Sequence, residues 1–197
     1  VTIPNSVTSI GKDAFDGCSG LVSVTILGSV MSIGCRAFDY CRNLTTVRIE
    51  DCEESLSFDT RIRGNLGYTD MEIFRNCALK EVYIGRDISY TGCSPFNDSS
   101  FSVHSIVTFG DHLTKISHQA LRNCSNLATI NIPKNVTYIT GYAFHGTAWY
   151  NNQPDGLIYL GKVLYGYKGD MPQNTKVDVK NGTINISSAF YGCSGLT

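Results

Sequence analysis

The chain lacks the features that mark several large classes of protein. No apolar run approaches the roughly 18 residues that a bilayer-spanning helix requires. The segment Val1–Pro4 has neither the basic start nor the apolar stretch of a secretory signal peptide. Sixteen basic residues nearly balance seventeen acidic ones, so the positive charge typical of nucleic-acid binders is missing. We therefore expect no nucleic-acid partner and no membrane insertion.

Catalytic and metal-binding motifs are also missing. The sequence has no Gly-x-Ser-x-Gly, no His-Glu-x-x-His, no phosphate-binding glycine loop and no dinucleotide-binding pattern. It has no Cys-x-x-Cys pair of the kind found at zinc sites. His104, His112, His118 and His145 fit no motif and are expected on the surface. The sequence therefore predicts a protein that is not an enzyme and holds no metal or other cofactor.

A repeat is the dominant feature of the sequence. The pattern of Val7–Leu21 returns without a gap, 23 residues later, as Val30–Leu44. Each copy has a large apolar anchor, followed three residues later by a small residue. The anchors are Phe15, Phe38, Phe74, Phe96, Leu121, Phe144 and Phe190, and the small residues are Cys18, Cys41, Cys77, Ser99, Cys124, Thr147 and Cys193. Seven such pairs indicate tandem units of about 23 residues.

Each unit contains a short alternation of apolar and polar residues that predicts a strand. Val24–Ile26 is the clearest case, and Val30–Ile33 is a second extended piece of the same unit. The Ala-Phe stretch that follows predicts a helical turn too short to be stable alone. The equivalents of the first strand are expected at Val47–Ile49, Val82–Ile84, Val107–Phe109, Ile130–Ile132 and Val177–Val179.

These patterns predict an α/β repeat solenoid formed by residues 1–197 as one domain. A unit of this size cannot close its own core, so neighbouring units must stack and share one.

Two insertions interrupt the repeat, at about 50–70 and 147–175. The unusually large distances between the anchors on either side of them indicate these insertions. In the second, Leu157–Leu160 and Val163–Tyr167 predict a β-hairpin turning at Gly161-Lys162. Since no polar cap covers either end, we expect a fragment of a longer protein.

The unit has the signature Leu-x-x-Val-x-Ile-Pro, then Val-x-x-Ile, then Ala-Phe-x-x-Cys-x-x-Leu. It resembles the BspA-like leucine-rich repeats found in surface proteins of anaerobic bacteria and some parasitic protists. The segment Thr147–Tyr159 is also similar to one that recurs in those proteins. The resemblance implies a right-handed leucine-rich-repeat superhelix with a parallel sheet on its concave face. It also implies an extracellular or cell-surface binding protein that takes part in adhesion and host contact.

Eight cysteines suit either free thiols or disulfides. Five of them share a slot that Ser99 and Thr147 also occupy, and a metal-binding or paired position could not accept those replacements. We therefore expect buried free thiols at this slot. Cys35, Cys52 and Cys93 lie outside it. In an exported protein Cys52 could form a disulfide with Cys35 or Cys93, and free thiols are the alternative.

Two of three candidate binding surfaces follow from the repeat and its first insertion. The first surface is the row of outward-facing strand residues, because alternate side chains of a strand point to opposite faces. Its mixed chemistry suits recognition, and a solvated face that binds nothing is the alternative. The second surface is the charged part of the first insertion, from Glu50 through Arg61 and Arg63, with a mobile surface loop as the alternative. The row comprises Thr25, Arg48, Tyr83, Thr108, Asn131 and Asp178.

The third candidate surface is the aromatic hairpin region of the second insertion. Aromatic side chains are enriched at protein interfaces, and their faces also stack on sugars. A small satellite core that covers the interrupted repeat is the alternative. The aromatic residues are Trp149, Tyr150, Tyr159, Tyr165 and Tyr167.

The sequence as a whole favours a non-enzymatic, secreted or cell-surface module that binds a protein partner. Many shallow contacts spread over several units would supply the binding. Glycan binding through the aromatic hairpin and a purely structural stalk are the alternatives.

Overall fold

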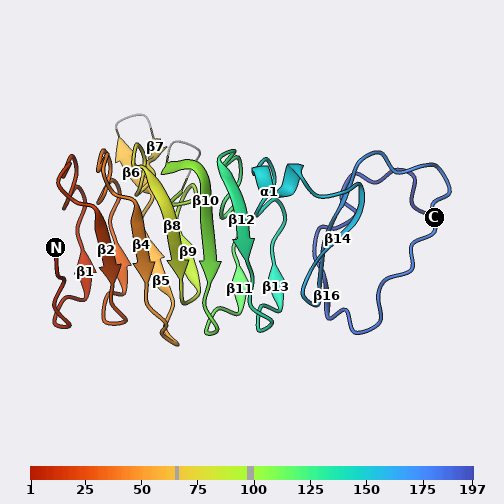
Figure 1. The fold of residues 1–197 in the computed structure, drawn as a ribbon, viewed down its shortest axis with the longest axis horizontal. Helices are drawn as coiled ribbons and strands as arrows, with labels where there is room; N and C mark the ends of the chain where they lie inside the picture. Colours follow the sequence, from red (N-terminus) through yellow and green to blue (C-terminus); the bar gives the residue numbers. More distant parts are fainter. Residues whose placement is uncertain (65–66, 97–99) are drawn as a thin grey trace.

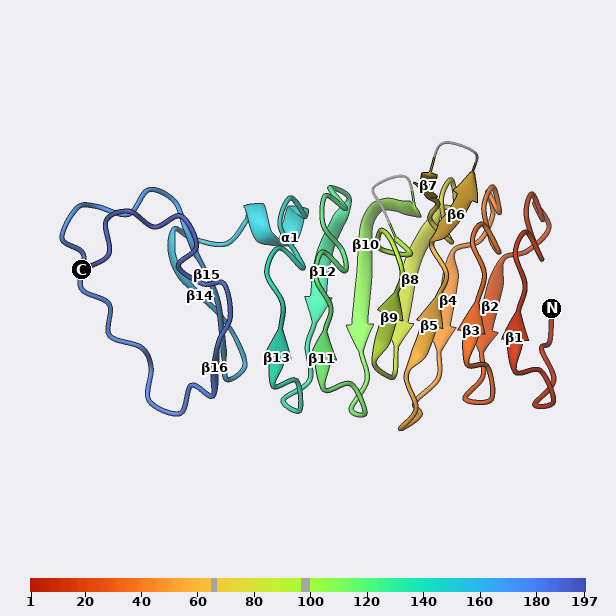
Figure 2. The same ribbon diagram turned by 180° about the vertical axis from the view of Figure 1, so that it is seen from behind.

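The computed structural model describes residues 1–64, 67–96 and 100–197. Ser99, which the sequence places in the small-residue slot, lies outside the described residues. The units stack along one axis, from the N-terminus at one end to the C-terminal region at the other (Figure 1). Successive units add short parallel strands to two sides of the stack, and Figure 2 shows the second side. Buried apolar side chains form one core cluster through the stack, which confirms the predicted solenoid.

The larger sheet contains the first five strands that the apolar alternation predicts. Equivalent residues of neighbouring strands pair directly, as Val24 does with Val47 and Val47 with Val82. These valines are buried, and the residues between the core positions face outward. In spatial order the parallel strands are β2 (Ser23–Ile26), β4 (Thr46–Ile49), β8 (Leu79–Ile84), β10 (Phe101–Phe109) and β12 (Leu127–Asn131).

Shorter strands line the other side of the stack (Figure 2). Each has only two or three residues, and its apolar residue points into the core, as Ile10 and Ile33 do. They form one four-stranded and one two-stranded parallel sheet. The strands are β1 (Ser9–Ile10), β3 (Ser32–Ile33), β5 (Leu56–Phe58) and β9 (Ile88–Tyr90), then β11 (Lys115–Ile116) and β13 (Tyr138–Ile139).

A column of stacked phenylalanine rings runs through the first four units. The Phe38 ring lies 5.1 Å from Phe15 and 5.3 Å from Phe74, and Phe96 continues the column 5.1 Å beyond Phe74. The planes differ by only 7°. This spacing matches the distance between neighbouring strands, so every unit can place its ring at the same point. The Ala-Phe stretches themselves are tight turns, and within the described residues the one α-helix is α1 (Ala148–Asn151).

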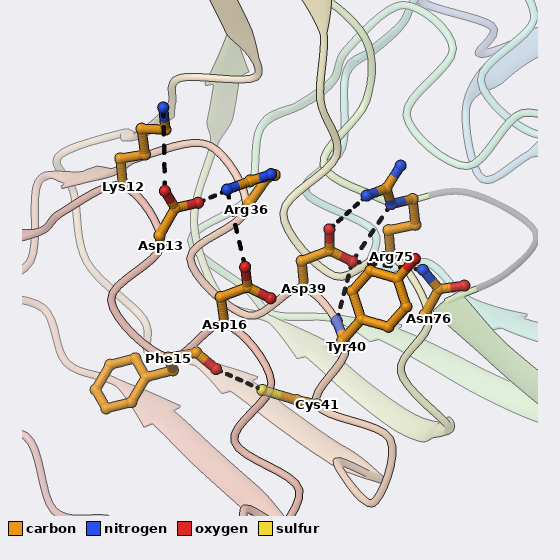
Figure 3. A network of polar contacts seen from close by, with 10 residues as sticks. All are labelled: Lys12, Asp13, Phe15, Asp16, Arg36, Asp39, Tyr40, Cys41, Arg75 and Asn76. Atoms are coloured by element: carbon orange, nitrogen blue, oxygen red, sulfur yellow. Dashed lines mark hydrogen bonds and ion pairs between the residues drawn. The ribbon is translucent and has the colours of Figure 1, made fainter.

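Polar contacts between units stabilise these turns. The turns contain non-glycine residues in the left-handed region, among them Asp13, Arg36 and Tyr40 at φ of 59°, 56° and 55°. Figure 3 shows how units 1 to 3 are joined there: Arg36 donates to Asp13 at 2.7 Å, and Arg75 donates to the buried Asp39 at 2.6 Å. The hydrogen bond from Arg36 lowers the pKa of Asp13 below its ordinary value. Contacts of this kind offset the roughly 1–2 kcal/mol that each left-handed residue costs.

The structure subdivides the first insertion, predicted at about 50–70. Leu56–Phe58 is strand β5, which pairs with β3 and β9 and so belongs to the repeat. The extra chain is an antiparallel pair, β6 (Arg61–Gly64) and β7 (Gly67–Asp70), which projects from one edge of the stack (Figure 1). Ile33 pairs with Phe58, 25 residues later instead of 23, and this change of spacing concealed the strand in the sequence.

The second insertion contains the predicted β-hairpin. Strands β14 (Gly156–Leu160) and β15 (Val163–Lys168) pair in antiparallel fashion. Gly161 begins the connecting turn at φ of 58°, a conformation that glycine adopts without strain. Strand β16 (Asn185–Ile186) pairs with the other edge of β15. Strand β15 also contacts β13, and Ile158 and Val163 belong to the common core, so the hairpin is part of the stack.

The strand predicted at Val177–Val179 is wrong. These residues have no regular structure, and Asp178 is exposed. A strand needs a free edge to pair with. Strand β15 already has β14 and β16 on its two edges, and helix α1 contacts β12 at the end of the larger sheet. β14 and β16 are the end strands of their sheet, but residues 177–179 pair with neither, so the apolar alternation there does not produce a strand.

Candidate functional site

Five of the six residues of the predicted strand row lie side by side on the outer face of the larger sheet. Thr25 pairs with Arg48, Arg48 with Tyr83, Tyr83 with Thr108, and Thr108 with Asn131. We call these five residues the sheet row. All are exposed or half-exposed. Asp178, the sixth predicted member, does not belong to it, because its segment is outside every sheet.

The centre of the sheet row is held in place by a cluster of three side chains. The Arg48 guanidinium lies 4.0 Å from the centre of the Tyr83 ring. The Tyr83 hydroxyl donates to Asp51, with 2.9 and 2.8 Å to its two carboxylate oxygens, and Arg48 lies 3.8 Å from the same carboxylate. Burial, together with the nearby Asp51 carboxylate, raises the pKa of Tyr83. Tyr83 therefore presents a neutral hydroxyl, and the exposed cation of Arg48 is already oriented.

Asp51 is a functional candidate that the strand pattern did not identify. It is the second residue after β4 and lies three residues after Arg48, and the sequence placed it only among the charged residues of the first insertion. An arginine in a strand with an acidic residue just beyond the strand was the one sequence signal that could have identified Asp51. The acid reaches back over the end of the sheet to the neighbouring unit.

A shallow groove of about 280 Å³ crosses the strands β4, β8 and β10 at the sheet row. The apolar side chain of Ile106 is exposed beside it. An open groove with a cation, an aromatic ring and an apolar side chain suits an extended protein segment better than an enclosed small molecule. The groove is lined by Arg48, Tyr83, Thr108, Thr46, Glu81 and Ile106.

The charged surface predicted from Glu50 through Arg61 and Arg63 packs against the preceding unit at its start. The side chain of Arg63 lies outside the described part of the structure. Glu50 accepts a hydrogen bond from the Gly28 amide at 3.3 Å, and the Cys52 thiol lies 3.8 Å from the Gly28 carbonyl. Behind this contact lies Arg86, which is fully buried and donates to carbonyls of the Leu27–Val30 turn. The beginning of the insertion is thus part of a packed junction between units. Sequence analysis missed Arg86, since one basic residue after a strand carries no recognisable signal.

The residues of the aromatic hairpin region have different surroundings, although Tyr165 lies 6.3 Å from Tyr150 and lines the same cavity as Tyr150 and Tyr167. Trp149 and Tyr165 pack edge-on or tilted against Phe144, at 5.7 and 5.5 Å between ring centres. The Tyr165 hydroxyl accepts a hydrogen bond from the Phe144 amide at 2.8 Å, and burial raises the pKa of Tyr165. Tyr159 lies elsewhere, with the Lys180 ammonium 4.4 Å from its ring centre. Trp149 and Tyr165 therefore form the satellite core considered from the sequence.

The remaining two aromatic residues, Tyr150 and Tyr167, line a cavity of about 170 Å³. Three rings that sequence analysis did not group with them complete its wall. Tyr142 lies 5.7 Å from His145 and 6.2 Å from Tyr191, with both pairs near perpendicular. We call this space the tyrosine cavity, and its principal lining residues are Tyr142, His145, Tyr150, Tyr167, Ser188 and Tyr191.

All four histidines lie on the surface, as predicted. Within the described ranges, no group of three His, Cys, Asp or Glu residues lies close enough to hold a metal ion. None of the helices in the described part of the chain is long and apolar enough to span a membrane.

None of the eight cysteines, all of which lie in the described residues, is in a disulfide, and this includes Cys35, Cys52 and Cys93. In the repeat slot, Cys41, Cys77 and Cys124 are buried, as predicted. Cys18 is exposed and Cys193 is half-buried, so the prediction of burial is wrong at Cys18. Burial at this slot comes from the adjacent unit, and Cys18 lies at the outer end of the stack.

The interior thiols take part in the contacts between units. Cys41 donates to the carbonyl of Phe15 at 3.0 Å (Figure 3), and Cys77 donates to that of Phe38 at 3.2 Å. Burial raises the pKa of Cys41 to about 11 and raises the pKa of Cys77 further. These thiols are therefore protonated donors at neutral pH.

We expect iodoacetamide to distinguish Cys18 from Cys41 in the folded protein. At pH 8 a pKa near 11 leaves about one Cys41 thiol in a thousand ionised, and burial restricts access as well. Cys41 should react on the order of 100-fold more slowly than Cys18. Peptide mass spectrometry over a time course measures both rates, and the same reaction in guanidinium chloride should make them similar. Equal rates in the folded protein would contradict the buried position of Cys41.

Comparisons with known proteins extend this description. The family model described as the BspA type leucine rich repeat region matches in six copies, over residues 1–60 and 59–153. No curated protein matches the chain. Among solved structures, a leucine-rich repeat protein from Bacteroides ovatus is similar, with 21% sequence identity and a TM-score of 0.36. The similarity covers 96% of this chain and 57% of that one, so the chain spans little more than half of that protein.

Proposed function

Because the chain belongs to the BspA-type leucine-rich repeat family, we propose that it is a non-enzymatic binding module whose sheet row contacts a protein partner. We further propose that it works outside the cell or at the cell surface, in adhesion. The family supports this location, since such repeats occur in bacterial surface proteins. We propose this surface because the outward residues of five neighbouring strands line up in the sheet row.

The chemistry of the sheet row supports recognition of a protein. Arginine and tyrosine are among the residues that contribute most to binding energy at protein interfaces. Here Arg48 and Tyr83 lie at the centre of the row, and their contacts with Asp51 orient them before a partner arrives. Ordered side chains lose less entropy on binding, so the contact gains affinity. Thr25 and Asn131, at the two ends of the row, supply hydrogen-bonding groups around this centre.

The sheet row also spans five strands, which makes the proposed binding surface long. Each strand adds one outward residue about 4.8 Å from the next, so the row provides an extended face with no deep pocket. Such a face suits many individually weak contacts with a partner surface. The exposed Ile106 adds apolar area beside Tyr83.

Replacing both Arg48 and Tyr83 by alanine is expected to weaken partner capture at least roughly tenfold, because these are central interface residues. The change should leave the folded protein intact, with Tm lowered by no more than about 3 °C, since an exposed cation–π pair contributes about 0.5–1 kcal/mol. Biolayer interferometry against immobilised collagen, laminin and other purified extracellular-matrix proteins measures capture. Thermal unfolding measures the effect on stability.

A matched control is available on another face. Arg42 and Tyr40 also form a cation–π pair, with 5.6 Å between the guanidinium carbon and the ring centre, and both are exposed. Alanine at these two positions should leave capture unchanged. Capture that survives the loss of Arg48 and Tyr83 would exclude the sheet row, and capture of no matrix protein would count against the adhesive role.

A further inference from the structure

We propose that the tyrosine cavity binds one neutral, hydroxyl-rich six-membered ring, which means a pyranose unit of a glycan. This site is separate from the sheet row and does not depend on the function proposed for it. The walls of the cavity come from the turn after β13, from α1, from β15 and from the turn after β16. Residues far apart in the sequence thus converge on a single space.

The size of the cavity limits the ligand. Its volume of about 170 Å³ is close to that of a protein cavity of about 150 Å³ known to hold benzene. One six-membered ring therefore fits, whereas a nucleotide or a peptide segment does not. Tyr191 at 78% exposure and Tyr142 at 38% exposure stand at the surface, where they can contact whatever is attached to that ring.

Gly166 contributes no side chain to this space. It lies in the interior of β15 and lines the cavity, although glycine weakens a strand. A Cβ atom placed on Gly166 meets no atom within 4 Å, and the residue does not have a positive φ. Neither crowding nor a positive φ requires glycine here, but the pairing of β15 with β14 shifts register between Gly166 and Leu164, and glycine is common at such bulges. A side chain at this position would occupy the cavity, so glycine leaves that space open.

The lining selects a neutral and polar ligand. None of the residues around the cavity is Asp, Glu, Lys or Arg, so a charged ligand would find no ion-pair partner in the wall. The tyrosine hydroxyls, the Ser188 hydroxyl and the His145 imidazole can donate to and accept from sugar hydroxyls. A wholly apolar ring would leave these groups without partners. The tyrosine faces supply the stacking surface that the C–H face of a pyranose requires.

The test uses the whole chain and a panel of methyl glycosides of glucose, galactose, mannose and N-acetylglucosamine. At least one glycoside should shift the amide NMR signals of Gly166 and Tyr167, with a dissociation constant on the order of 1 mM, as expected for a single small ring. Gly166→Val should weaken binding at least tenfold, because its side chain fills the cavity. The same variant should keep or raise Tm, since valine suits a strand.

Two further variants complete the test. Tyr191→Ala removes an exposed wall residue and should also weaken binding without unfolding the protein. Tyr159→Ala is the matched control, because Tyr159 lies on the same hairpin but outside the cavity, and it should bind as the unmodified chain does. A glycan array then distinguishes glycans of glycoproteins from polysaccharides.

Several results would overturn the proposal. One is the absence of any shift at glycoside concentrations about tenfold above the expected constant. A second is a Gly166→Val variant that binds as well as the unmodified chain. A third is binding of N-acetyltyrosinamide in place of every glycoside, which would assign the cavity to a side chain of a protein partner.

Discussion

Replacing Phe38 by alanine is expected to lower the free energy of unfolding by about 3–5 kcal/mol, because the ring is completely buried and stacks on neighbours at 5.1 and 5.3 Å. For a chain of this length, that loss corresponds to roughly 6–20 °C in Tm. The effect should be large because Phe38 contributes to two interfaces at once, those with the units before and after it. Denaturant unfolding followed by circular dichroism measures the change.

Phe15 provides the matched control. It occupies the same repeat position, but it is only half-buried and stacks on a single ring. Phe15→Ala should therefore cost less than half as much as Phe38→Ala. Equal losses at the two positions would show that stability does not come from contacts between neighbouring units, which is the basis of the solenoid description.

Replacing Arg86 by alanine is expected to cost at least about 3 kcal/mol, since a charge-assisted hydrogen bond contributes about 1.5–3 kcal/mol and three are lost. The guanidinium of Arg86 donates to the carbonyls of Leu27, Gly28 and Val30 at 3.0, 3.1 and 2.8 Å. Without it, the three carbonyls each lose a charge-assisted hydrogen bond and a cavity forms between two units. Denaturant unfolding gives the total loss. Hydrogen exchange at the amides of 28–30 shows whether the turn is released.

Two variants help to interpret this result. Arg86→Lys keeps the charge but not the planar group that reaches several carbonyls, so its loss should be intermediate. Arg122→Ala removes an exposed arginine and should change stability by no more than about 0.5 kcal/mol. An Arg86→Ala protein that unfolds at the same denaturant concentration as the unmodified chain would refute the structural role of Arg86.

The repeat and most of its strands could be predicted because each unit carries its own pattern. Val24, Val47, Val82 and Val107 are separated by irregular intervals, yet each lies in the same local alternation, and all four meet in one sheet. The slot occupied by Cys41 and Cys77 was recognisable for the same reason. Alternation alone was insufficient at Val177–Val179, because a strand also needs a partner edge, which only the assembled stack reveals.

The candidate sites were predictable only in part. The sheet row follows from strand periodicity, so five of its six members were placed correctly before the fold was known. The cluster around Arg48 needed the structure, since Asp51 and Tyr83 are 32 residues apart and their contact follows no repeat spacing. The aromatic hairpin region was identified by composition. Composition could not show that Tyr165 is core and that Tyr150 faces a cavity.

The sequence by itself determined the stacked repeat, the register of the larger sheet and the free thiols of the interior slot. Those features depend on a local pattern that each unit carries, so equivalent residues meet in the stack even where the interval between units changes. Tertiary structure decided the rest: the burial of Arg86, the contact of Asp51 with Tyr83, and the union of Tyr142, His145 and Tyr191 around one cavity. Such contacts join positions with no common period, because they arise where the chain departs from its repeat.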